Sequence, residues 1–251
     1  PVETKPQDMT PPPRKAAVPD FAPFFDVNAP LPGERNKDAL GYLTGLDEKV
    51  YRSWPGVNAS LLKHQTPCEM LHSMGDDKPR TWNSITLGTV LHVAALEPWK
   101  LEPAYRHDHF LLCETDGLDT VTAKKQRAAN PGKLLVSVDI MEAAHGCLSA
   151  IRADAKAADV LNPEGLHTEA TAIVWDGDFM VWRKSRVDAL RAGVDYLADV
   201  KTTSSGLDAH SWERECWKWG YFHQAAWYLD THWLLTGEWR ARFRWIALTT
   251  T

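Results

Sequence analysis

The sequence predicts an α+β fold with a mixed central β-sheet flanked by helices, and three observations lead to this class. Apolar residues make up 44% of the 251 residues, which is enough for the core of one substantial domain. Two segments with strand character, 168–175 and 179–187, are joined by Asp176-Gly177-Asp178, and an Asp-Gly pair in this position is a strong hairpin signal. Segments on both sides of this hairpin carry the 3.6-residue apolar periodicity that is typical of helices.

The first part of the chain differs in composition from the rest. Residues 1–38 are rich in proline and lack apolar periodicity, so we expect a flexible N-terminal segment there. A single folded domain is then expected over residues 39–251.

Three helices are predicted before the sheet. Asn58 or Ser60 is a suitable N-cap for the first, which extends to about residue 74. The second, 83–96, is apolar on nearly all sides, and we therefore expect it to be buried. The other expectations in this region are a strand over 107–113, a polar loop over 114–133 and a third helix over 138–161.

A third strand, 194–201, follows the hairpin after a tight turn at Arg191-Ala192-Gly193. Asp208 is then placed to cap one long helix over 209–235, which Gly237 closes. Residues 240–248 alternate charged and apolar side chains, as an edge strand does.

The chemistry of the chain is concentrated where the third strand ends. Side chains alternate along a strand, so Asp199 and Lys201 face the same way, roughly 6–7 Å apart, and Val200 faces the other way. Asp188, on the preceding strand, brings a second carboxylate to the same place. Two acids this close repel each other unless a positive charge lies between them, and a hard divalent cation is the usual solution. The pattern indicates a metal-dependent phosphodiesterase site.

Asp188, followed after a short hairpin by Asp199-Val200-Lys201, resembles the PD-(D/E)xK nuclease signature, and so do Thr202-Thr203 and the QAAWY at 224–228. Upstream, LGTVLH at 87–92 with LEP at 96–98 resembles the histidine-bearing helix of the RecE-like (exonuclease VIII) branch. PGVNASLLK at 55–63, then Pro67, resembles the N-terminal helix entry of that branch. The aspartate and lysine triad is weakly specific alone. The five pieces in this order, over about residues 50–250, are much more specific.

The resemblance implies a Mg²⁺ site in which Asp188 and Asp199 are ligands, joined by the backbone carbonyl of Val200 and the imidazole of His92. Magnesium prefers carboxylates and water and leaves positions open for phosphate oxygens, whereas imidazole is a softer ligand that suits Mn²⁺ better. Lys201 is expected beside the attacking water and the scissile phosphate, where it orients the nucleophile or stabilises developing charge.

A further acid is expected near the start of the first strand of the hairpin. Members of the family often place an acid there that serves the metal directly or through water, and Glu169 is the candidate, with Glu164 as its competitor. Glu97, five residues after His92, is open to either a structural or a functional interpretation.

Gln224 and Tyr228 are four residues apart and therefore share one face of the predicted long helix. In the wider recombination-nuclease family, a helix with this spacing borders the active site and orients the substrate. The alternative is that Tyr228 packs in the core and Gln224 is a surface amide.

Net charge is only −5, so the chain is not a polycation and any DNA binding must use local basic patches. The candidate phosphate contacts, each of which also fits a solvated surface charge, are Lys124, Lys125, Arg127, Arg183, Lys184 and Arg186. The four cysteines are widely spread, which favours free thiols in a reducing compartment. With no membrane-spanning run and no signal peptide, we expect a cytoplasmic protein, bacterial or encoded by a phage.

The resemblance implies a Mg²⁺-dependent 5′→3′ exodeoxyribonuclease that degrades double-stranded DNA from its ends and leaves 3′ single-stranded overhangs. It further implies a homo-oligomeric ring, possibly a tetramer, and a partner single-strand annealing protein of the RecT kind. Two alternatives are open. One is a structure-specific or restriction-like endonuclease on the same fold, and the other is a non-catalytic module that binds DNA ends.

Overall fold

The computed structural model describes residues 30–63, 82–115 and 117–249. Most of the predicted flexible segment, 1–29, and most of the helix predicted after Asn58 lie outside these residues. The described residues form two compact units. Of the described residues, the first unit comprises 30–63, 169–198 and 220–244, and the second comprises 82–115, 117–168, 199–219 and 245–249.

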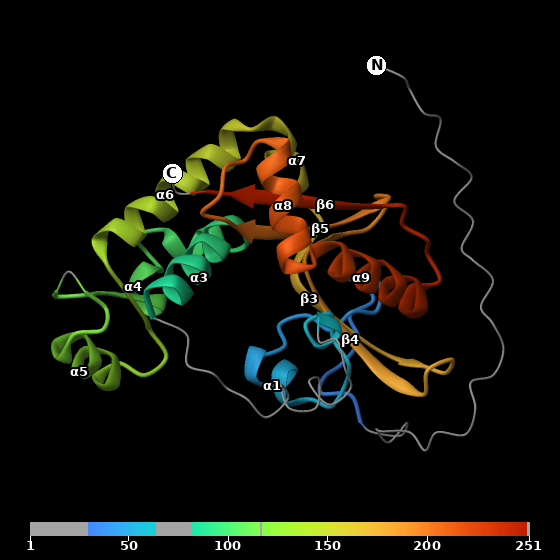
Figure 1. The fold of residues 1–251 in the computed structure, drawn as a ribbon. Coiled ribbons are helices and arrows are strands. Elements are labelled where there is room, and N and C mark those ends of the chain that lie inside the picture. The colour runs from blue at the N-terminus through green and yellow to red at the C-terminus, as the bar shows by residue number, and fades with distance from the viewer. Residues whose placement is uncertain (1–29, 64–81, 116, 250–251) are drawn as a thin grey trace. The chain divides into compact units, whose positions relative to one another are not determined.

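A four-stranded sheet carries the long hairpin that the sequence predicts (Figure 1). Its order is β3 (Leu166–Asp176), β4 (Val181–Arg191), β5 (Tyr196–Thr202) and β6 (Arg242–Leu248). Strands β4 and β5 are antiparallel, with Ala189 opposite Ala198. The predicted α+β class is confirmed, because this sheet occurs together with helices over much of the described chain.

The turn between β3 and β4 has the chemistry that its sequence predicts. The Asp176 carboxylate accepts hydrogen bonds from the backbone amides of Asp178, at 3.0 Å, and Phe179, at 3.3 Å. Such an Asx arrangement satisfies amides that the strands cannot use, and it fixes where β3 ends and β4 begins. Gly193, in the turn before β5, has a φ of +74°, a conformation that glycine adopts without steric cost.

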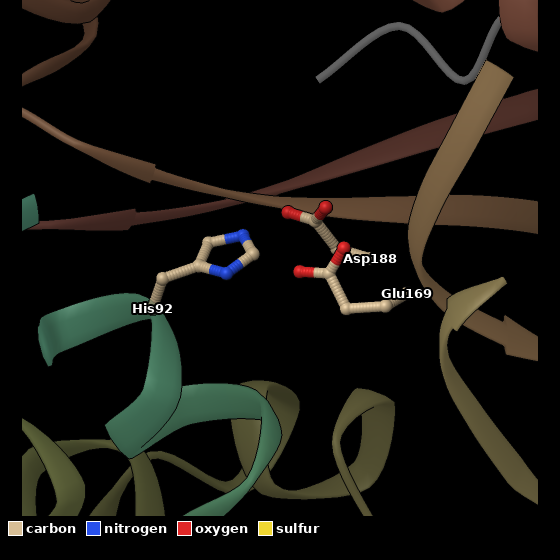
Figure 2. A group of neighbouring side chains, drawn as sticks. All are labelled: His92, Glu169 and Asp188. Carbon is tan, nitrogen blue, oxygen red and sulfur yellow. The ribbon is translucent and has the colours of Figure 1, made fainter. Parts of the chain in front are cut away.

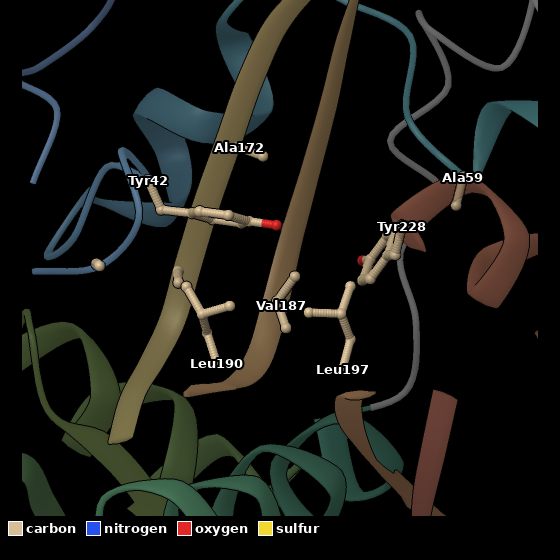
Figure 3. Packing of buried hydrophobic residues seen from close by; sticks show 9 residues of the cluster. Tyr42, Ala59, Ala172, Val187, Leu190, Leu197 and Tyr228 are labelled. Carbon is tan, nitrogen blue, oxygen red and sulfur yellow. The ribbon is translucent and has the colours of Figure 1, made fainter. Parts of the chain in front are cut away.

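The first unit has a hydrophobic core in which a loop, strands β3, β4 and β5, and helix α9 (Tyr221–Thr236) meet (Figure 3). Helix α9 packs against β4. The buried members of this core are Ala39, Tyr42, Ala59, Ala170, Ala172, Val187, Leu190, Leu197 and Tyr228. Val187 is therefore anchored directly next to Asp188, so packing on one face of β4 determines where the acidic side chain is displayed. The remaining elements of this unit are α1 (Glu48–Ser53) and η1 (Leu61–Lys63).

The second unit is largely helical, and its central contact joins α3 (Trp82–Leu96) to α6 (Val138–Ala153). The predicted burial of the apolar helix is confirmed at Val90, Leu91 and Ala94. Its other elements are η2 (Pro98–Leu101), α4 (Arg106–His109), β1 (Phe110–Leu112), α5 (Val121–Ala129), β2 (Leu134–Val136), α7 (Ala155–Val160) and α8 (Ala209–Trp219). Strands β1 and β2 form a separate parallel pair.

Two helices that the sequence predicts to be continuous are interrupted in the structure. The predicted helix over 138–161 ends at Ala153, because the Asp154 carboxylate accepts the amides of Lys156 and Ala157 and caps a new helix, α7. The predicted helix over 209–235 is divided by Gly220, whose φ of 65° and ψ of 38° are left-handed, so α8 and α9 are separate. Apolar periodicity continues across both breaks, which is why periodicity alone misses them.

Two shorter predictions are also corrected. The first part of the predicted strand over 107–113 is the short helix α4, and only Phe110–Leu112 is a strand. The predicted polar loop over 114–133 contains α5, which Thr120 caps by accepting the Ala123 amide. Cys113, Cys147 and Cys216 are free thiols, as predicted for the cysteines that the structure describes. Within the described ranges, none of the helices has the length and apolarity needed to span a bilayer.

Candidate metal centre

Two neighbouring strands present the two aspartates that the sequence singles out. Asp188 lies on β4 in the first unit, and Asp199 lies on β5 and is counted with the second unit. Both side chains are buried. A buried carboxylate is unfavourable unless charge or hydrogen bonds compensate it.

Lys201 supplies part of that compensation for Asp199. Its Nζ donates a hydrogen bond to Oδ2 of Asp199, so the two side chains share a face of β5, as strand alternation predicts. The Lys201 ammonium also lies 5.5 Å from the centre of the Trp245 ring on β6. The side chain of Val200, between them, is buried.

Glu169, on β3 of the first unit, brings another carboxylate to Asp188. A carboxylate oxygen of Glu169 lies within 4.8 Å of one of Asp188. In Figure 2 these two carboxylates lie beside each other. His92, the predicted imidazole ligand, lies on α3 in the second unit. The competing candidate, Glu164, is exposed in the turn that precedes β3.

The backbone of Glu169 is unusual for a strand. Its φ is +52°, in the left-handed region that residues other than glycine rarely occupy. One residue in this conformation inside a strand acts as a bulge and redirects its side chain, and such strain occurs often at functional sites. The strained backbone therefore aims Glu169 toward Asp188, a feature with no signal in the sequence.

This donor set fits a hard divalent cation. Two carboxylates within 4.8 Å of each other, one of them buried, repel unless a positive charge lies between them. Carboxylate oxygens are the ligands that Mg²⁺ prefers, and an added imidazole suits Mn²⁺ as well.

A family model described as the PDDEXK-like domain of unknown function (DUF3799) matches residues 59–250. The chain belongs to this family. The match covers Asp188, Asp199 and Lys201, so the predicted superfamily is confirmed, whereas the RecE-like branch stays a prediction. No curated protein matches the chain. Membership of a PDDEXK-like family indicates a metal-dependent nuclease, a class of hydrolase.

Gln224 and Tyr228, which have the Gln-x-x-x-Tyr spacing of the wider family, lie on α9. Tyr228 is buried in the first-unit core, its ring 6.0 Å from that of Phe243, and Gln224 is half-buried one turn earlier. A part for either side chain in substrate binding stays a prediction. Glu97 forms an ion pair of 2.6 Å with Lys100 in the same region of the chain, which agrees with a structural role.

The interpretation of Arg183 and Lys184 as solvated charges or phosphate contacts is wrong, because both are buried. Arg183 pairs with Asp176 and Asp230 and lies 3.7 Å from the centre of the Trp227 ring. The Lys184 ammonium donates to the carbonyls of Tyr51, at 2.8 Å, and Trp54, at 2.6 Å, and burial with the nearby charge of Arg52 lowers its pKa to about 8. Long-range partners make these cations part of the interior.

The sequence marked Arg186 only as a candidate phosphate contact, and the structure places it beside Glu169. Its Nε lies 3.5 Å from Oε2 of Glu169 and 3.2 Å from Oγ1 of Thr171. A signal was present, because Arg186 and Asp188 are two apart on one strand and therefore share a face. Trp245, which lies against Lys201, had no such signal, since 44 positions separate the two in sequence.

Proposed function

We propose that this chain is a Mg²⁺-dependent exodeoxyribonuclease. In this proposal it degrades double-stranded DNA from its ends in the 5′→3′ direction and leaves 3′ single-stranded overhangs. One observation carries the nuclease part: the match to the PDDEXK-like family covers Asp188, Asp199 and Lys201, and Lys201 binds Asp199. Direction and the choice of DNA ends rest on the resemblance to RecE-like enzymes.

The residues that would hold the cation are the side chains of Asp188, Asp199, Glu169 and His92 and the backbone carbonyl of Val200. A divalent cation bound there would activate water and neutralise charge on the scissile phosphate. Lys201, held on the acidic face of β5 by Asp199, would orient the attacking water or stabilise the developing negative charge. Gln224 and Tyr228 would orient the substrate from α9.

The assembly and partner are further parts of the proposal. We propose a homo-oligomeric ring, possibly a tetramer, which would keep the enzyme on one DNA end during digestion. A single-strand annealing protein of the RecT kind would receive the 3′ overhang. Both rest on the resemblance, and light scattering of the purified protein tests the oligomer directly.

The deciding experiment uses linear duplexes labelled at either the 5′ or the 3′ ends, incubated with Mg²⁺, with Mn²⁺ or with EDTA. We expect release of mononucleotides from the 5′ label only when a divalent cation is present, and no attack on a covalently closed plasmid. The Asp199→Asn variant serves as the inactive control. Cutting of the closed plasmid would identify an endonuclease instead. Tight DNA binding with no cleavage in either metal would identify a binding module and overturn the proposal.

A further inference from the structure

Helix α8 lies directly after the strand end that carries Lys201, and it borders a polar hollow of about 300 Å³. Asp208 caps the helix, its carboxylate accepting the Ser211 amide at 3.0 Å. The hollow is lined by Ser205, Ser211, Arg214, Glu215 and Lys218. Apart from Ser205, these residues are three or four apart on α8 and therefore share one helix face. The chain thus builds a concave surface lined by two cations, two hydroxyls and one carboxylate.

The only acid in the hollow is already engaged. Oε1 of Glu215 accepts a hydrogen bond from Oγ of Ser205 at 3.0 Å and lies 3.6 Å from Nζ of Lys218, and its Oε2 accepts Nε1 of Trp219 at 2.7 Å. Partial burial opposes ionisation of Glu215, but these hydrogen bonds and the Lys218 charge outweigh it, so the pKa of the carboxyl is lowered. Glu215 therefore organises the surface and pairs with Lys218, while Asp208 is engaged by the hydroxyl and amide of Ser211.

Arg214 is the cation that Glu215 does not hold. It is exposed, and within the described ranges it has no ion pair or hydrogen bond. An exposed guanidinium is a favourable group for binding phosphate, because arginine offers a planar set of donors that matches phosphate oxygens.

The same helix also exposes large aromatic side chains. Trp217 is 67% exposed and Trp219 is 46% exposed, although tryptophan is normally well buried. Nζ of Lys218 lies 4.9 Å from the centre of the Trp219 ring. Aromatic rings interleaved with basic residues are the features that single-stranded nucleic acid uses, since bases stack on the rings while cations contact the backbone.

We infer that α8 binds the unpaired end of a DNA strand, with one backbone phosphate in the hollow on Arg214 and a base stacked on Trp217. The charge and the rings together favour this occupant over an acidic peptide, which would use the cations and not the tryptophans. Ser205 follows Lys201 by four residues, so the bound strand would approach the end of β5. This inference rests on the proposed function, and it adds the surface that holds the strand.

The test measures binding of a short dye-labelled single-stranded oligonucleotide to the full chain in EDTA, so that no cleavage takes place. Arg214→Ala is expected to weaken binding about tenfold and to reduce the slope of log affinity against log salt by about 0.7, the value for one lost contact to a single strand. Trp217→Ala is expected to weaken binding about tenfold with the salt slope unchanged, and Trp217→Phe to restore most of it, because stacking needs only a ring.

Matched controls come from the second unit. Lys156→Ala removes one exposed positive charge from α7, and Trp99→Ala removes one exposed indole from η2. Both should bind the oligonucleotide as the unaltered chain does. The inference is wrong if Arg214→Ala and Lys156→Ala lose affinity equally, or if Trp217→Ala matches Trp99→Ala.

Cleavage assays separate this inference from the proposed function. If the unaltered chain digests DNA while the α8 variants bind the oligonucleotide normally, the inference fails and the nuclease proposal stands. If the unaltered chain cleaves no DNA but the variants lose binding, the strand surface stands and the nuclease proposal fails.

Discussion

Arg186 lies 3.5 Å from Glu169, measured from Nε to Oε2, and this pair shows how the acidic site is balanced. The side chain of Arg186 is mostly buried, and it also donates to Oγ1 of Thr171 and to the carbonyl oxygen of Leu46. It is therefore held in place from several directions. One fixed cation beside two carboxylates leaves an excess of negative charge, which is the condition that a divalent cation satisfies.

The Glu169 carboxylate is expected to support metal-dependent cleavage, while the backbone conformation of this residue lowers the free energy of unfolding. Its φ of +52° costs on the order of 1 kcal/mol in any residue with a Cβ, and glycine avoids this cost. Both Glu169→Gly and Glu169→Gln remove the carboxylate and should lower metal-dependent cleavage. Glu169→Gly alone should relieve the backbone, so in EDTA it should be about 1 kcal/mol more stable to urea than Glu169→Gln.

Met180 provides a matched control for that prediction, because its φ is +55° in an exposed turn. Met180→Gly should gain similar stability and keep full cleavage. Undiminished cleavage by Glu169→Gln would show that Glu169 is not part of the metal site.

Substitutions of Asp199 and Lys201 are expected to change metal binding in different ways. Asp199→Asn removes a ligand, so binding of Mn²⁺ measured by calorimetry should weaken by about tenfold or more. Lys201→Ala removes the cation that now pairs with Asp199, so Mn²⁺ should bind equally well or more tightly. Both variants should lose cleavage by at least about a hundredfold. Asp195→Asn, at an exposed position before β5, should behave as the unaltered chain does. Normal cleavage by either site variant would contradict the site.

Two substitutions of Tyr228 distinguish its role in core packing from a role in substrate binding. Because it is buried in the first-unit core, Tyr228→Ala should lower the free energy of unfolding by about 3–5 kcal/mol. Tyr228→Phe keeps the ring and removes the hydroxyl, so it should unfold almost as the unaltered chain does while cleavage falls, and Gln224→Ala should act similarly. Tyr105→Phe, at an exposed position, is the control. If Tyr228→Phe cleaves normally, the residue serves the core alone.

His232 is expected to make stability depend on pH. Nδ1 of His232 lies 2.9 Å from the hydroxyl oxygen of Tyr42, and burial, with the charge of Arg240, lowers its pKa to about 3. An unfolded chain protonates histidine near pH 6.5. Between about pH 6.5 and about pH 3, the unfolded state therefore binds the proton and the folded state does not, so stability falls as pH falls, by up to about 1.4 kcal/mol per pH unit.

The measurement is urea denaturation from pH 7 down to pH 4. His232→Gln should show a shallower decline than the unaltered chain, whatever its stability at pH 7. His145→Gln, at an exposed position on α6, should follow the unaltered chain. Parallel curves for the unaltered chain and His232→Gln would contradict the burial of an uncharged imidazole.

Local signals predicted the strand hairpin well. The turn at Asp176 and the face shared by Asp199 and Lys201 depend only on strand alternation and on contacts between near neighbours. Helix interruptions were harder to predict, because Asp154 and Gly220 end helices through their own caps while apolar periodicity continues past them.

The sequence by itself determined the strand hairpin and the aspartates and lysine that it displays, because alternation and turn chemistry act over a few residues. The tertiary structure decided the rest. It placed the Glu169 carboxylate beside Asp188, with Glu169 at a φ of +52°, and it buried Arg183 and Lys184 against partners far away in the chain. Whether a charge faces solvent, a metal or the core depends on those distant partners, and no local pattern contains them.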